Sequence, residues 1–126
     1  MRILSSDKFE KRWKDLLNKQ KGFEKHLKKR RRFITATLES LKYREALNTN
    51  YFEKCKGSQI IHSISVWRKG TLNVRFLCAM YNEGEMCVYL DVFLEKSKED
   101  YKIDSKIEEE ARQIGLKERL RLWYGE

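Results

Sequence analysis

The chain has 126 residues, of which 40% are hydrophobic and 37% are charged, and its formal net charge is +9. This length favours one domain with a single core, and no apolar run approaches the roughly 20 residues needed to span a bilayer. The N-terminus does not resemble a signal peptide, and the three cysteines, Cys55, Cys78 and Cys87, form no metal-binding motif. We therefore expect a cytoplasmic protein that uses no metal or other cofactor and does not enter a membrane.

The N-terminal half is predicted to consist mainly of helices. Residues 1–5 have the apolar anchors of a short edge strand, and Ser6 or Asp7 can cap the helix that follows. Apolar residues at helical spacing predict a first helix over residues 8–21 and a second over residues 23–47, separated by Gly22. Two helices joined at one glycine predict a helical hairpin.

Residues 58–96 have the alternating pattern of β-strands. Strands are predicted over residues 59–68, 72–81 and 86–95, separated by turns that contain Gly70 and Gly84, and residues 51–57 are predicted to be a loop. One face of each strand is apolar. In the last strand this face comprises Met86, Val88, Leu90, Val92 and Leu94. The opposite face is mixed, with a charge at its centre, which favours it as the working face.

The order of these elements predicts an α+β domain in which an N-terminal helical hairpin packs on a small antiparallel sheet. A C-terminal helix is expected over residues 103–119, and an apolar tail that includes Trp123 follows it. We expect this tail to pack on the body or to dock a partner. The sheet face away from the hairpin is expected to stay partly open.

The positive charge is concentrated in the N-terminal half. Residues 8–56 contain 16 basic and 6 acidic side chains, a net charge of +10. Such a field favours polyanions, which include nucleic acid, the ribosome and acidic proteins. The densest run predicts contacts with RNA phosphates or with an acidic partner, and its alternative role is a solvated helix face; it comprises Lys28, Lys29, Arg30, Arg31 and Arg32.

Short motifs in the C-terminal half resemble the RelE/ParE toxin superfamily, including its HigB-like branch. Residues 72–77, Leu-Asn-Val-Arg-Phe-Leu, resemble the family's Tyr-Arg-apolar-apolar strand. Residues 90–97 resemble its last strand, which often ends in Phe-x-Lys-Lys-Ser/Thr, and residues 107–112, with Ala111, resemble its final helix. The resemblance covers residues 50–115 well and the helical hairpin in general form only.

This resemblance implies a RelE-like fold and the toxin of a type II toxin–antitoxin system, neutralised by an acidic or DNA-binding antitoxin. Many relatives are mRNA endoribonucleases that act in the ribosomal A site without a metal ion and so inhibit translation. In their reaction the RNA 2′-hydroxyl attacks the adjacent phosphate. This requires a base for the hydroxyl, cations for the developing phosphorane charge and an acid for the leaving 5′-oxygen.

Candidate catalytic residues follow from the same resemblance. Arg75 matches the family's strand arginine and suits bidentate donation to phosphate. Asp91 and Glu95 are predicted to lie on the same face of the sheet, so the alternative is that Arg75 forms an ion pair there. Lys96 and Tyr101 follow the last strand, where relatives carry a basic residue and often a tyrosine. Lys96 would stabilise phosphate charge, and Tyr101 would stack on a base or orient the nucleophile. Glu95 is an alternative base.

Residues of the first predicted strand of the sheet and its flanks complete the candidates. The pKa of a histidine suits acid–base chemistry, but the apolar residues with which His62 alternates favour a hydrogen-bonded core position. Trp67 alternates with two serines, which places it on the open face, where it would stack a base. His26, in the basic helix, is expected to carry no chemistry. The flanking cations are either RNA contacts or solvated loop charges; they are Lys54, Lys56 and Arg68.

The match to the family also has a gap. In relatives the strand that corresponds to residues 59–68 often contributes lysines to the site, and residues 62–65 contain none. This gap favours an alternative in which the fold is a non-catalytic module that binds nucleic acid or gyrase. A third alternative is a partner-binding domain that uses the apolar tail.

Overall fold

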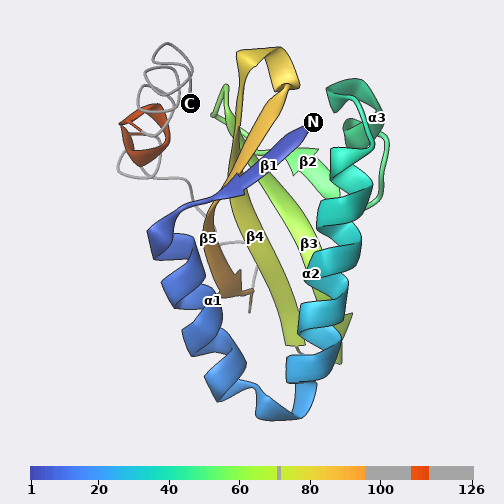
Figure 1. Ribbon diagram of the computed structural model, residues 1–126, viewed down its shortest axis with the longest axis vertical. Coiled ribbons are helices and arrows are strands. Elements are labelled where there is room, and N and C mark those ends of the chain that lie inside the picture. Colours follow the sequence, from blue (N-terminus) through green and yellow to red (C-terminus); the bar gives the residue numbers. More distant parts are fainter. Residues whose placement is uncertain (71, 96–108, 114–126) are drawn as a thin grey trace.

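The computed structural model describes residues 1–70, 72–95 and 109–113. They form an α+β domain in which helices pack on a five-stranded sheet of order β1-β5-β4-β3-β2 (Figure 1). No helix of the described residues is long and apolar enough to cross a membrane. The elements are β1 (Arg2–Ser5), α1 (Asp7–Lys19), the 3-10 turn η1 (Lys21–Phe23), α2 (Glu24–Glu39), α3 (Tyr43–Leu47), β2 (Phe52–Lys54), β3 (Ile61–Lys69), β4 (Leu72–Tyr81), the 3-10 turn η2 (Asn82–Gly84) and β5 (Met86–Leu94).

The first strand and the first helix each begin within one residue of the predicted position. β1 lies at one edge of the sheet and pairs in parallel with β5. Ser6 is the N-cap of α1, and its side-chain oxygen accepts a hydrogen bond of 3.1 Å from the backbone N–H of Phe9. The cap satisfies one of the donors that the first turn of a helix leaves without a partner.

The predicted second helix over residues 23–47 is wrong, because the chain forms two helices there, α2 and α3. The amino group of Met1 donates hydrogen bonds to the carbonyl oxygens of Glu39 and Leu41, at 3.2 and 2.9 Å, and so satisfies carbonyls where α2 ends. The hydroxyl of Ser40 bonds back to the carbonyl oxygen of Thr37 at 2.7 Å. Such local bonds compete with helix continuation, and the spacing of apolar residues does not reveal them.

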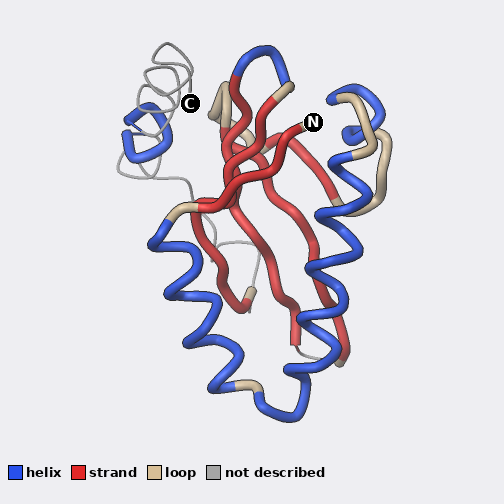
Figure 2. The backbone as a smooth tube through the Cα atoms, in the orientation of Figure 1, coloured by secondary structure: helices blue, strands red, loops and turns tan. Residues whose placement is uncertain are grey.

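The helices α1 and α2 diverge from η1, as Figures 1 and 2 show, and each contacts the sheet separately. α1 lies against β5, whereas α2 lies against β3. The ion pair between Arg31 and Glu10 links the two helices. The expected helical hairpin is therefore not confirmed.

The sheet contains one strand that the sequence pattern did not indicate. β2 lies within residues 51–57, which were predicted to be a loop, and it pairs antiparallel with β3. Phe52 anchors this short strand, with 2% of its surface exposed. The last three strands form the predicted antiparallel meander, although β3 begins two residues later than expected.

Two bulges change which side chains share a face of the sheet. Between Leu77 and Cys78 of β4, the paired residues on β5 skip Leu90, so the alternation of β5 reverses at that point. The predicted apolar face of this strand is therefore wrong: Val92 and Leu94 join the helix side, and Leu90 packs on the other side with Met86 and Val88. The second bulge, at Val66 in β3, reverses Trp67 in the same way.

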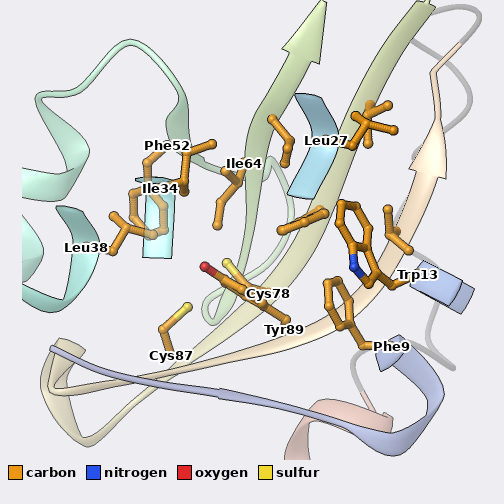
Figure 3. Packing of buried hydrophobic residues seen from close by; sticks show 14 of the residues in the cluster. Phe9, Trp13, Leu27, Ile34, Leu38, Phe52, Ile64, Cys78, Cys87 and Tyr89 are labelled. Carbon is orange, nitrogen blue, oxygen red and sulfur yellow. The ribbon is translucent and has the colours of Figure 1, made fainter. Parts of the chain in front are cut away.

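The main core lies between the sheet and the helices. Phe9 and Trp13 of α1 pack against Phe76 and Tyr89, with the rings of Phe9 and Phe76 centred 4.8 Å apart (Figure 3). The predicted core position of Trp13 is confirmed. The opposite face was expected to stay partly open, but it carries a second buried cluster that includes Leu77, Val88, Leu90 and Ala111 of the helical segment 109–113.

The turn between β4 and β5 requires glycine at position 84. Gly84 has a φ of +89°, a region that L side chains rarely adopt, and a Cβ placed on it would lie 2.4 Å from the Cβ of Tyr43. The turn therefore packs closely on α3 and holds the Tyr43 ring above the sheet, beside Phe52 and His62.

Candidate functional site

A polar cluster occupies the sheet face away from α1 and α2, and Arg75 lies at its centre. The Nε of Arg75 donates to the carboxylate of Glu95 in a short ion pair, and its Nη1 donates to Ser63 Oγ at 3.1 Å. Glu53 lies on the other side, 3.6 Å from the same Nη1. The strands β2, β3 and β4 and the residue after β5 therefore meet in one cluster, defined by Arg75, Glu95, Ser63, Glu53 and Asn73.

Glu95 is the most enclosed charged group of this cluster. Its side chain is 7% exposed and that of Arg75 is 17% exposed. Asn73 also donates to Glu95, with 2.6 Å between its Nδ2 and the same carboxylate oxygen, Oε2, that Arg75 contacts. A buried carboxylate needs such donors to remain charged, and here a guanidinium and an amide supply them.

The bulge at Val66 adds a further cation to this face. Arg68 pairs with Asn73 across β3 and β4, so it belongs to the side of the sheet that carries Arg75. Arg68 is exposed, unlike Arg75. One enclosed carboxylate, one enclosed guanidinium and one exposed guanidinium therefore share a surface, which suits a base and two phosphate-binding groups.

Asp91 does not take part in this cluster. It was expected to be an alternative partner of Arg75, but it instead forms an ion pair with Arg12 of α1, with 3.1 Å between Oδ1 and Nε. Asp91 also accepts a hydrogen bond from the backbone N–H of Val92. Asp91 pairs with Leu77 and so lies on the side of the second buried cluster, and Arg12 contacts it where β1, which pairs with β5 only as far as Tyr89, no longer covers the edge of β5.

His62 is a core residue on the helix side of the sheet and has no exposed surface. Its Nδ1 bonds to the carbonyl oxygen of Ile60 at 2.9 Å, and its Nε2 lies 2.6 Å from the Tyr43 hydroxyl. Since only a protonated Nδ1 can donate to a carbonyl, Nε2 accepts from the hydroxyl of Tyr43. Burial lowers the pKa of His62 below its ordinary value of 6.5, and the charge of Lys54 lowers it further. The structure thus keeps this histidine neutral and away from Arg75.

Trp67 lies on the helix side and not on the open face where it was expected. Its ring stacks on that of His26 from α2, with centroids 5.4 Å apart, and it packs against the edge of the main core. The bulge at Val66 causes this reversal, because the extra residue moves Trp67 out of phase with Ser65.

The basic run on α2 is divided between two environments. Arg30 donates to the carbonyl oxygen of Val66 at 3.0 Å, and Arg31 pairs with Glu10 above the ring of Phe9. The Arg31 bond lowers the pKa of Glu10, although burial opposes this shift. The other three members are exposed: Lys28, Lys29 and Arg32, of which Lys28 pairs with Glu24 at 3.0 Å. Two arginines of the run thus stabilise the fold, and the remaining cations face solvent.

The remaining predicted residues fall in three places. Lys54 is exposed on β2, and Lys56 is exposed in the turn that follows. Lys96 and Tyr101 lie outside the described residues, as do Trp123 and most of the helix predicted over residues 103–119. Among the described residues no group of three or more His, Cys, Asp or Glu side chains could hold a metal ion.

The three cysteines are buried free thiols. Burial raises the pKa of Cys55 to about 11, with a smaller contribution from the charge of Glu53. Burial likewise raises the pKa of Cys78, which lies beside Cys87. Thiols with raised pKa values are poor nucleophiles at neutral pH, so Cys55 and Cys78 act here as small core side chains.

Sequence reasoning missed Ser63, Glu53 and Asn73 as members of the cluster around Arg75. Asn73 and Ser63 alternate in phase with the predicted working face, so that pattern carried a signal for both. Glu53 carried none, because its segment was not recognised as a strand. Comparison of the chain with known proteins yields no matching family model and no matching curated protein.

Proposed function

We propose that the protein is a toxin-type endoribonuclease of RelE/ParE-like fold that inhibits translation by cleaving mRNA. The observation that carries this proposal is the contact of Arg75 with the enclosed carboxylate of Glu95, beside the exposed Arg68. The order of elements and the motif around Arg75 support the family. An antitoxin that covers these cations is the expected partner.

In the proposed reaction Glu95 is the general base. It takes the proton of an RNA 2′-hydroxyl, the 2′-oxygen forms a bond to the adjacent phosphorus, and the bond from phosphorus to the 5′-oxygen breaks. Arg75 and Arg68 stabilise the negative charge on the phosphorane. The leaving 5′-oxygen takes a proton from an acid, for which Lys96 and Tyr101 are the candidates. The products are a 2′,3′-cyclic phosphate and a 5′-hydroxyl.

This chemistry can be tested by inducible expression in a bacterial host, with sequencing of RNA 5′ ends before and after treatment with polynucleotide kinase. We expect growth arrest and new ends inside reading frames that ligate only after the kinase adds a phosphate. Glu95→Gln keeps the shape of the side chain and removes the base, so it should abolish the new ends. Lys14→Ala, which removes an exposed cation of α1, is the matched control.

Three outcomes separate the proposal from its rivals. New ends that persist at full frequency in Glu95→Gln would exclude Glu95 as the base. Growth arrest without new ends would indicate a different target, such as gyrase. Absence of arrest with folded protein present would contradict the toxin function altogether.

A second candidate function is a nucleic-acid-binding module without catalysis. One observation favours it: Arg75 is held between Glu95 and Glu53, and two carboxylates weaken its attraction for a phosphate. This candidate predicts salt-dependent RNA binding without cleavage products, and the same sequencing experiment distinguishes it from the ribonuclease.

A further inference from the structure

We propose that the seam between α2 and the end of β3 binds single-stranded RNA by base stacking, at a site separate from the Arg75 cluster. The seam is defined by seven residues: Phe23, His26, Arg30, Phe33, Tyr51, Trp67 and Lys69. The inference rests on the proposed function for the choice of RNA as ligand. It adds a second site on the other side of the sheet.

Aromatic and cationic side chains are paired along the whole seam. Lys69 Nζ lies 5.9 Å from the ring centroid of Phe23, and the His26 and Trp67 rings are stacked. The guanidinium of Arg30 lies 5.2 Å from the Phe33 ring centroid and 5.8 Å from that of Tyr51. Aromatic faces interleaved with cations are what single-stranded nucleic acid requires, because bases stack on the rings while phosphates contact the charges.

Two rings of the seam are available to a ligand. Phe33 is 55% exposed, the largest value among the exposed large hydrophobic side chains of the described residues, and His26 is exposed above Trp67. Phe33 lies seven positions after His26, which corresponds to about 10 Å along the helix axis. Arg30 lies between them in sequence. One RNA strand can therefore place a base on the ring of His26, another base on the ring of Phe33, and a phosphate near Arg30.

The electrostatic surroundings favour an anionic ligand. Residues 21–36 contain seven basic side chains and one acidic side chain, Glu24, which is paired with Lys28. Lys25, Lys29 and Arg32 are exposed at positions i, i+4 and i+7 of α2, so they form a stripe beside the seam. An exposed aromatic ring next to this stripe of positive charge indicates that a ligand is held by stacking as well as by charge attraction.

The test measures fluorescence anisotropy of a labelled oligouridylate dodecamer, with Glu95→Gln as background so that the oligonucleotide stays intact. Loss of one stacking surface should weaken binding about 10-fold for Phe33→Ala and for His26→Ala. Neither variant removes a lysine or arginine. Leu47→Ala, the matched control, removes another exposed large hydrophobic side chain of the described residues and should change affinity less than about 2-fold.

Duplex RNA of the same length provides the second measurement. Stacking requires unpaired bases, so the protein should bind the single strand more tightly, and Phe33→Ala should remove this preference. Lys29→Ala should weaken the binding of both the single strand and the duplex, and it should reduce the salt dependence of binding.

The proposal is overturned if Phe33→Ala and His26→Ala bind the single strand with the same affinity as the Glu95→Gln background protein, while Lys29→Ala binds it more weakly. That result would leave a purely electrostatic surface, suited to an acidic protein. If Glu95→Gln itself abolishes binding, RNA is held only at the Arg75 cluster. Binding at the seam without any cleavage in cells would contradict the proposed function and leave the seam intact.

Discussion

The two faces of the sheet use the same three long strands, but their side chains differ in kind. The face under α1 and α2 buries the rings of Phe9, Trp13, Phe76 and Tyr89 among other apolar side chains. The opposite face combines apolar residues such as Val88 with the enclosed pair of Arg75 and Glu95. The alternation of side chains along each strand creates both faces, and in β5 this alternation reverses at the bulge at Leu90. The polar groups around Arg75 thus lie on a sheet whose larger buried cluster is on the other side.

The largest expected effect is on the helix-covered face. Phe9→Ala removes a ring that has no exposed surface and should lower the free energy of unfolding by about 3–5 kcal/mol. Phe33→Ala changes the same residue type at an exposed position and should cost less than about 0.5 kcal/mol. Urea unfolding measures both, and similar costs for the two variants would contradict this assignment of the core.

The next effect concerns the Arg75 face. Arg75→Ala leaves the enclosed Glu95 without its cation and should cost about 3 kcal/mol, toward the low end for a buried pair because Arg75 is 17% exposed. The double variant Arg75→Met, Glu95→Leu removes both charges and should be much closer to the parent in urea unfolding. It should still lack cleavage activity. If the double variant were less stable than Arg75→Ala, the ion pair would itself be a main contributor to the stability of the fold.

The smallest expected effect is on the pH dependence of the free energy of unfolding, to which His62, beside Tyr43, contributes. Because the pKa of His62 is lowered by folding, protonation favours the unfolded chain. The contribution of this group is constant above about pH 6.5 and falls as the pH drops below it, by up to about 1.4 kcal/mol per pH unit. His62→Gln keeps an acceptor for Tyr43 and should lose this part of the acid sensitivity.

The measurement compares urea unfolding of the parent and His62→Gln at about pH 7.5 and about pH 5.5. We expect the parent to lose more stability than His62→Gln at the lower pH, so the gap between the two proteins changes across this interval. An unchanged gap would mean that His62 is protonated in the folded protein, and the Tyr43 hydroxyl would then need another acceptor.

The sequence by itself determined the α+β class, the approximate position of the first helix behind a cap at Ser6 or Asp7, the three-stranded meander and the core position of Trp13. These features depend on local pattern: apolar spacing, a capping side chain and glycine at turns. It also indicated that Arg75 and Glu95 share a face, because both lie in phase with the predicted alternation.

Only the tertiary structure decided the break between α2 and α3, the strand β2 and the two bulges. The break involves the amino group of Met1, and β2 depends on pairing with β3 and the burial of Phe52. The bulge at Val66 places Trp67 against α2 and Arg68 beside Asn73, the reverse of simple alternation. A single extra residue reverses every side chain that follows it, and the partner strand, not the local sequence, determines where it lies.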